Sequence, residues 1–106
     1  MVKGTLDFLV LKALTLSTMH GFEVVSWIEA RSGGKLGIDD SAVYQALYRM
    51  EGRGLIDVSW GVTGNNRRAR YYAITAAGRA HLKLQTAQWL TYVHTVNGIL
   101  TGPATT

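Results

Sequence analysis

The chain has 106 residues and a mass of 11.6 kDa, which is enough for about one small domain and excludes a two-domain enzyme. Hydrophobic residues make up 47% of the sequence and charged residues 17%, below the charged fraction of roughly 25% that is typical of soluble domains. This surplus of apolar side chains favours an oligomer. The sequence contains no cysteine, which excludes a disulfide scaffold, a thiolate zinc site and a cysteine nucleophile.

The positive charge is concentrated in the second half of the chain. The formal net charge is +4 and the pI is about 9.7. Residues 1–57 contain seven acidic and six basic side chains, whereas residues 58–106 contain five basic side chains and no acidic one. A basic segment beside a nearly neutral one points to a polyanion, either nucleic acid or an anionic membrane surface.

The apolar runs are too short for a membrane-spanning helix, which needs roughly 18 or more consecutive apolar residues. The first residues also lack the pattern of a secretory signal, because Asp7 interrupts the apolar stretch and no small-residue cleavage site follows it. We therefore expect a cytoplasmic protein without a membrane partner.

Two amphipathic helices are predicted in the first third of the chain. Apolar side chains between residues 6 and 14 recur with helical spacing, and Thr5 is the predicted N-cap. A second helix is predicted over residues 20–31, where the glycines that follow provide its end. Its predicted inward-facing residues are Phe22, Val25 and Ile28.

A third helix is predicted from Asp39 to Gly54 with two different faces. The negative charges of the aspartates near its start interact favourably with the positive end of the helix dipole, and their side chains can cap the first backbone N–H groups. The apolar face is formed by Val43, Leu47 and Met50. The opposite face carries hydrogen-bonding and aromatic side chains at the same helical spacing, namely Ser41, Tyr44, Gln45, Tyr48 and Arg49.

The next segment predicts a β-hairpin. Residues 55–60 alternate between apolar and polar, residues 61–66 are rich in turn formers, and residues 71–74 return as a strand. The tip and the returning arm hold Asn65, Asn66, Arg67, Arg68 and Arg70. Thr75 is the predicted cap of a long last helix.

An apolar stripe runs along the last helix and predicts a helix–helix interface between two copies. The stripe consists of Leu82, Trp89, Val93, Val96 and Leu100. Trp89 has two interpretations: it anchors this dimer interface, or, together with Tyr92, it lines a pocket for a flat aromatic ligand. Trp27 and Trp60 are interpreted as residues that pack in the core or on the hairpin.

Three helices followed by a basic hairpin are typical of a winged helix-turn-helix, whose second helix of the pair enters the major groove. The predicted fold class is therefore mainly α with a small β-hairpin. Residues 1–75 are predicted to form the DNA-binding domain, and residues 76–106 a C-terminal dimerisation helix and tail.

The predicted DNA-binding residues lie on the third helix and the hairpin: Ser41, Tyr44, Gln45, Tyr48, Arg49, Asn66, Arg67, Arg68 and Arg70. Arginine can pair with guanine and glutamine with adenine, while hairpin arginines can neutralise phosphates. The helix face also fits a plain solvated surface on which tyrosine rings cap the core. The hairpin arginines are stronger evidence for an external anion than this helix face is, because their positive charges repel one another.

No pattern in the sequence predicts catalysis, a cofactor or a metal. The three histidines, His20, His81 and His94, are far apart, and the chain has no metalloprotease, phosphate-loop or nucleophile-elbow motif. We expect these histidines to be capping, surface or packing residues, and we expect no enzymatic activity.

Several segments, in this order and spacing, resemble the PadR-like transcriptional regulators. They are residues 4–7 (GTLD), 19–23 (MHGFE), 43–51 (VYQALYRME), 54–56 (GLI), 65–72 (NNRRARYY) and 74–78 (ITAAG). The resemblance implies a homodimeric DNA-binding repressor of the short subfamily with one C-terminal helix. The family's DNA contacts carry over to Tyr44, Gln45, Tyr48, Arg49, Arg67, Arg68 and Arg70. Many members have proline where Gln45 stands, so base reading by Gln45 is not implied.

The sequence thus predicts a regulator, acting as a repressor, that binds a pseudo-palindromic operator in double-stranded DNA as a homodimer. Some members of the family release DNA on binding phenolic acids or hydrophobic drugs, but the resemblance carries over no ligand to this chain. The interpretation of Trp89 and Tyr92 as a ligand pocket is what makes a small aromatic effector a candidate. The alternative is a protein–protein interaction module, in which the last helix binds a different protein and the basic hairpin binds an acidic one. A ligand-binding scaffold or an enzyme has the least support.

Overall fold

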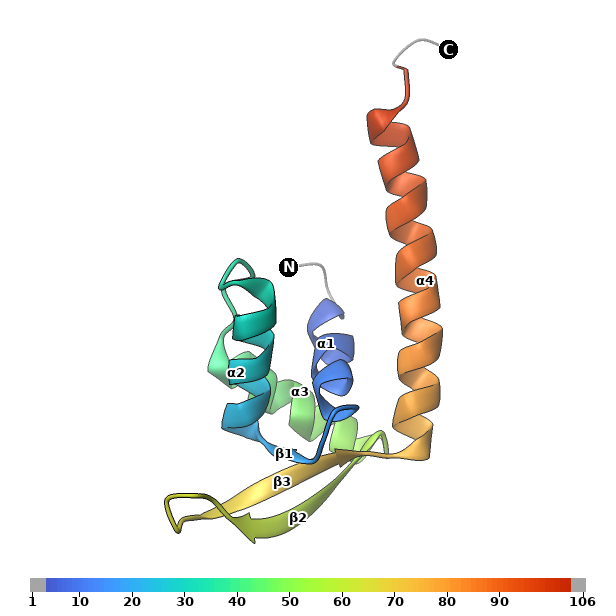
Figure 1. Cartoon of the computed structure of the whole chain (residues 1–106). Helices are drawn as coiled ribbons and strands as arrows, with labels where there is room; N and C mark the ends of the chain where they lie inside the picture. The colour runs from blue at the N-terminus through green and yellow to red at the C-terminus, as the bar shows by residue number, and fades with distance from the viewer. Residues whose placement is uncertain (1–3, 104–106) are drawn as a thin grey trace.

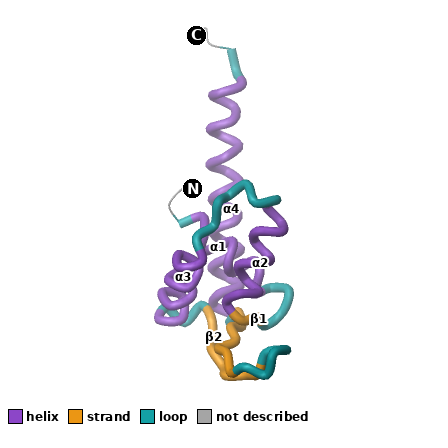
Figure 2. The backbone as a smooth tube through the Cα atoms, turned by 90° about the vertical axis from the view of Figure 1, so that its left-hand side faces the viewer, coloured by secondary structure: helices purple, strands orange, loops and turns teal. Residues whose placement is uncertain are grey.

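The structure is a computed structural model that describes residues 4–103. These residues form α1 (Thr5–Leu14), β1 (Met19–His20), α2 (Gly21–Ser32), α3 (Asp40–Gly52), β2 (Ile56–Val62), β3 (Arg68–Ile74) and α4 (Ala76–Thr101). The first three helices pack together above a small sheet, and α4 rises from the end of β3 and projects beyond them (Figure 1). A view turned by 90° shows the strands at the end of the molecule opposite the C-terminus (Figure 2).

The sheet confirms the predicted fold class and adds a strand to it. β2 and β3 form the expected antiparallel hairpin, residues 56–74, which we call the wing. The prediction missed β1, which pairs with β3 so that the strand order is β1-β3-β2. β1 has only two residues, Met19 and His20, and a strand of that length has no alternation that a sequence could reveal.

The hydrophobic core lies between the first three helices and the inner end of the sheet. Its fully buried side chains are Val10, Leu11, Val24, Val43, Leu47, Met50 and Ile56. Burial of each such side chain contributes about 1.5–3 kcal/mol to folding. The predicted apolar face of α3 is confirmed, because Val43, Leu47 and Met50 are all in this set.

The predicted cap of α1 is wrong by one position. Gly4 is the N-cap, with a φ of 85°, a left-handed conformation that glycine adopts without the steric cost other residues carry. Thr5 is therefore the first helical residue, and its Oγ1 is buried without a hydrogen-bond partner within the described chain. The two other predicted caps are confirmed: Asp39 accepts from the Ser41 N–H, and Thr75 accepts from the Gly78 N–H.

The predicted inward position of Phe22 is also wrong. Its side chain is 64% exposed, whereas Val25 and Ile28 are buried as predicted. The buried face of α2 begins instead at Gly21, where a Cβ atom would overlap the ring of Tyr44 from α3. Because Gly21 occupies this close contact between helices, the next residue turns outward.

The start of α4 is tied to the turn between α3 and β2. The Thr75 hydroxyl accepts from the Gly78 N–H at 2.9 Å and donates to the Gly54 carbonyl at 2.8 Å. Gly78 is the one buried residue within the described helix α4. Although α4 has 26 residues, no helix within residues 4–103 is both long and apolar enough to cross a membrane.

The close approach at Gly78 predicts a position-specific loss of stability. A Cβ at residue 78 would overlap the backbone carbonyl oxygen of Leu55, so Gly78→Ala should lower the free energy of unfolding by about 1–3 kcal/mol. Gly98→Ala in the same helix is the control, because its Cβ would meet open space, and it should be neutral or stabilising by up to about 1 kcal/mol. Urea denaturation of both variants measures the difference. Equal stabilities would contradict the steric explanation.

Candidate nucleic-acid interface

The polar face predicted for α3 points to solvent over its whole length. All five of its predicted residues are exposed: Ser41, Tyr44, Gln45, Tyr48 and Arg49. Tyr48 is 74% exposed, so its ring does not cap the core. Tyr44 is 46% exposed and rests partly against Gly21. Of the two tyrosines, only Tyr44 contributes to packing between helices.

The register of the wing places Arg68 and Arg70 on the face of the sheet whose inner end lies in the core. Trp60 pairs with Arg70 and Val62 pairs with Arg68. Cross-strand partners share a face of the sheet, and two residues further along each strand the same face carries Val58 and the buried Tyr72. β3 begins at Arg68, three positions before its predicted start, so both arginines belong to the strand rather than to the loop.

The turn at the tip of the wing is closed by backbone hydrogen bonds. The Thr63 N–H donates to the Arg67 carbonyl at 2.8 Å, and the Asn66 N–H donates to the Thr63 carbonyl at 2.9 Å. Asn66 has a φ of 59°, a left-handed conformation that asparagine tolerates better than most residues. Asn66 therefore shapes the turn that presents the exposed Arg67.

A groove of about 820 Å³ separates the outer face of α3 and the start of α2 from the wing. Its aromatic lining consists of Phe22, Tyr44, Tyr48, Trp60 and Tyr72, and its cationic lining of Arg67, Arg68 and Arg70. Three of these aromatic residues, Phe22, Trp60 and Tyr72, were absent from the predicted site. Trp60 could have been found, because it follows the buried Ile56 at an even spacing along the same strand.

The predicted residues divide into two groups around this groove. Tyr44, Tyr48 and the three wing arginines line it, whereas Ser41, Gln45, Arg49 and Asn66 are not among its lining residues. Arg49 lies at the opposite flank of α3, where its Nη2 is 2.7 Å from a carboxylate oxygen of Asp7 in α1. This pair is too exposed to contribute more than about 1 kcal/mol, but it holds the guanidinium beside α1.

A second ion pair connects α3 to the wing. Nη2 of Arg70 is 2.7 Å from Oε1 of Glu51, and both side chains are half-buried. The Arg70 guanidinium also lies 5.7 Å from the ring centroid of Tyr72. Burial raises the pKa of the Tyr72 phenol, partly opposed by the positive charge of Arg70, so this hydroxyl stays protonated at neutral pH. Arg70 thus fixes the base of the wing against the end of α3.

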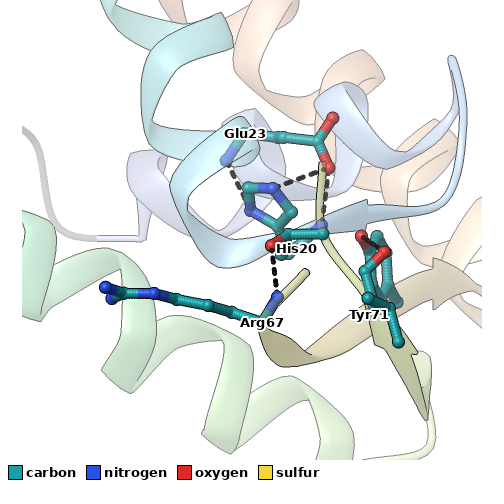
Figure 3. A network of polar contacts seen from close by, with 6 residues as sticks. His20, Glu23, Arg67 and Tyr71 are labelled. Carbon is teal, nitrogen blue, oxygen red and sulfur yellow. Dashed lines mark hydrogen bonds and ion pairs between the residues drawn. The ribbon is translucent and has the colours of Figure 1, made fainter. Parts of the chain in front are cut away.

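His20 connects the start of α2 to the sheet (Figure 3). Its Nδ1 accepts from the Glu23 N–H at 3.3 Å, while a Glu23 carboxylate oxygen accepts from the His20 backbone N–H at 3.1 Å. These reciprocal bonds form a capping box. The His20 ring also meets the Tyr71 ring edge-on at 5.5 Å between centroids. The prediction that His20 is a capping or packing residue is confirmed.

The stripe on α4 is partly covered by α1 and partly open. Leu82, Trp89, Val93 and Val96 are half-buried, and Leu100 is exposed. The Trp89 ring lies 5.8 Å from that of Phe8 in α1 and 6.1 Å from that of Tyr92. Trp89 also borders two hollows between α1 and α4, one of about 700 Å³ and one of about 250 Å³ that Tyr92 lines as well.

The chain has three packed helices, of which α3 exposes one face, and a basic hairpin beside that face (Figure 1). This arrangement defines a winged helix-turn-helix protein. The family model described as the transcriptional regulator PadR-like family matches residues 10–84, and the chain belongs to this family. The resemblance stated from the sequence is therefore confirmed. The protein is a transcriptional regulator with a winged-helix DNA-binding fold, and not an enzyme.

Solved structures of PadR family regulators agree with this assignment. A PadR-like transcriptional regulator from Bacillus cereus is 25% identical, with a TM-score of 0.81 over 97% of this chain and 98% of that one. A PadR family transcriptional regulator from Eggerthella lenta is 28% identical, with a TM-score of 0.76 over 95% and 86%. An uncharacterised protein of Lysinibacillus sphaericus is 25% identical over 88 residues, which cover 83% of this chain and 81% of that protein.

Proposed function

We propose that this regulator is a repressor that binds a pseudo-palindromic operator as a homodimer. The observation that carries the proposal is the groove between α3 and the wing, where the exposed face of a helix meets three arginines. In a winged helix, the exposed helix enters the major groove while the wing lies along the DNA backbone. The groove offers both surfaces to the same duplex.

The exposed residues divide by chemistry into base-reading and phosphate-binding groups. Ser41, Tyr44, Gln45 and Tyr48 are placed on the helix, where amide, hydroxyl and ring groups can meet base edges, thymine methyls and nearby phosphates. The exposed Arg67 and Arg68 are free to neutralise phosphates, with the neighbouring Asn66 beside them.

Arg49 and Arg70 contribute by exchanging an intramolecular carboxylate for DNA. Each guanidinium is already paired, Arg49 with Asp7 and Arg70 with Glu51. Solvent-accessible pairs of this kind are weak, so a phosphate or a guanine edge can displace the carboxylate at little cost. The two pairs keep these arginines oriented before DNA arrives.

The dimer is formed by α4, with residues 1–75 as the DNA-binding domain and residues 76–106 as the dimerisation segment. From residue 84 to residue 101 the helix contains no acidic residue, lysine or arginine. The apolar stripe in this segment is nevertheless only partly covered by the rest of the chain, because Trp89, Val93 and Val96 are half-buried and Leu100 is exposed. An exposed helix of this composition favours an interface, and a second copy supplies an identical apolar stripe.

The effector is a small, flat aromatic molecule that binds beside Trp89 and Tyr92. The support is geometric: the two rings border an apolar hollow between α1 and α4. Binding there would favour a dimer in which the two copies of α3, the recognition helices, no longer match successive major grooves. The effector would thus release DNA by shifting a population of dimer geometries.

The wing arginines are expected to determine the salt dependence of DNA binding. If each subunit contacts about four phosphates, the log–log salt slope of the dimer should be near −7, and removing three contacts per subunit should bring it to roughly −2. The variant is Arg67→Ala, Arg68→Ala and Arg70→Ala combined, titrated with the DNA upstream of its own gene and with a scrambled duplex. Arg49→Ala should instead relax the preference between the two duplexes. A triple variant with unchanged affinity for the scrambled duplex would refute this division.

A charge in the apolar stripe should separate the two subunits. Val93→Asp places a carboxylate in the middle of the proposed interface, where its desolvation is costly, and sedimentation equilibrium should then detect a monomer. Thr91→Asp is the matched control, because it adds the same charge to the opposite side of the helix and should leave the dimer intact. A wild-type protein that is itself monomeric would support the interaction module with a different partner for α4.

Aromatic ligands are expected to weaken operator binding and to quench Trp89. A panel of phenolic and polycyclic aromatic compounds should lower DNA affinity in order of their affinity for the free protein, read from tryptophan fluorescence. Trp89→Leu should abolish the effect of the ligands if the variant still forms a dimer. Identical DNA affinity across the whole panel would contradict an effector of this class.

A further inference from the structure

Trp60 lies in an unusual setting for a tryptophan. It sits in β2, in the outer half of the wing, and is 58% exposed, so burial in the core does not explain its presence. Tryptophan has the largest apolar surface of any side chain, and more than half of this residue's surface is left in water. Its ring instead forms a cation–π contact with the guanidinium of Arg68, whose central carbon lies 4.3 Å from the ring centroid.

The register of the wing explains how this contact forms. Trp60 is paired across the sheet with Arg70, and Arg68 is paired with Val62. Trp60 and Arg68 are therefore diagonal neighbours on one face, a separation that long side chains can bridge. Arg70, the direct partner of Trp60, is paired with Glu51 of α3, and the guanidinium that lies over the indole is that of Arg68.

The contact determines what Arg68 can offer to an anion. A guanidinium that stacks on an aromatic ring uses its flat face, while its five N–H groups in the plane stay free for hydrogen bonds. Arg70 is different, because one of its nitrogens is already bonded to a carboxylate. Within residues 4–103, Arg68 thus lies over the ring without donating a side-chain hydrogen bond.

We propose that Trp60 is a positioning residue for DNA binding, which holds Arg68 at the mouth of the groove so that its N–H groups meet a backbone phosphate. This inference rests on the proposed DNA-binding function. Both residues line the groove together with Tyr48 from α3, so the held guanidinium lies on the side of the wing that faces the recognition helix. A stacked arginine loses less conformational freedom when it binds a phosphate than one that moves freely in solvent.

The test is a double-mutant cycle that measures DNA affinity. The four proteins are the wild type, Trp60→Leu, Arg68→Ala and the double variant, each titrated with a fluorescently labelled mixed-sequence duplex at fixed salt. The free energy of an exposed stacking contact limits the effect of positioning to about a two- to fivefold change in affinity per subunit. Trp60→Leu should weaken binding by this factor in the presence of Arg68 and should have no effect in the Arg68→Ala background.

Two further variants separate positioning from a general effect on folding. Trp60→Phe keeps an aromatic face and should recover most of the affinity, whereas Trp60→Leu should not, although both should unfold at similar urea concentrations. Arg68→Lys keeps the charge but loses the flat face, so it should bind as weakly as Trp60→Leu.

The outcomes are distinguishable from failure of the proposed function. A wild-type protein that does not bind the duplex would overturn DNA binding, and this inference with it. A wild type that binds, combined with equal effects of Trp60→Leu in both backgrounds, would overturn the inference alone, because Trp60 would then act independently of Arg68. Full affinity of Trp60→Leu would overturn it as well.

Discussion

The burial of one face of α3 is the constraint on which the interface depends. Val43, Leu47 and Met50 are fully buried against the other helices and the inner sheet, so the helix cannot rotate about its axis without exposing them. Because side chains on opposite faces of a helix are fixed relative to one another, the same packing directs Tyr48 outward. Tyr44 lies at the edge of this exposed face, where its contact with Gly21 adds a second restraint. The residues that fold the domain thus also orient the surface proposed to bind DNA.

The wing extends this principle to a strand. One face of the hairpin begins in the core with Ile56 and continues outward to Trp60 and Arg68. Strand alternation alone determines which residues share that face. The three wing arginines nevertheless have three different environments, since Arg67 is exposed in the turn, Arg68 is stacked on an indole, and Arg70 is paired with a carboxylate. A count of positive charges would treat them as equivalent.

Much of the fold follows from local sequence patterns, and the parts that do not follow depend on distant contacts. The apolar spacing of α3 and the cap at Thr75 were predicted because each signal lies within a few neighbouring residues. The outward turn of Phe22 depends on the contact of Gly21 with α3, which no local pattern records. The pairing of Arg49 with Asp7 joins residues 42 positions apart, so the sequence identified the arginine as a candidate but not its partner. For Trp60, the alternation of the strand predicts which face it occupies. Its contact with Arg68 depends on the register of the hairpin, which the sequence does not show.

Thr75 gives the molecule a mechanical property. Its hydroxyl bonds the Gly54 carbonyl after α3 and the Gly78 N–H in the first turn of α4, and the backbone at Gly78 approaches Leu55 too closely to admit a side chain. The junction is therefore stiff, and the protein is 62 Å along its longest axis. Because α4 projects far beyond this junction, a tilt applied near its far end would strain the hydrogen bonds and the close contact that join it to the end of α3.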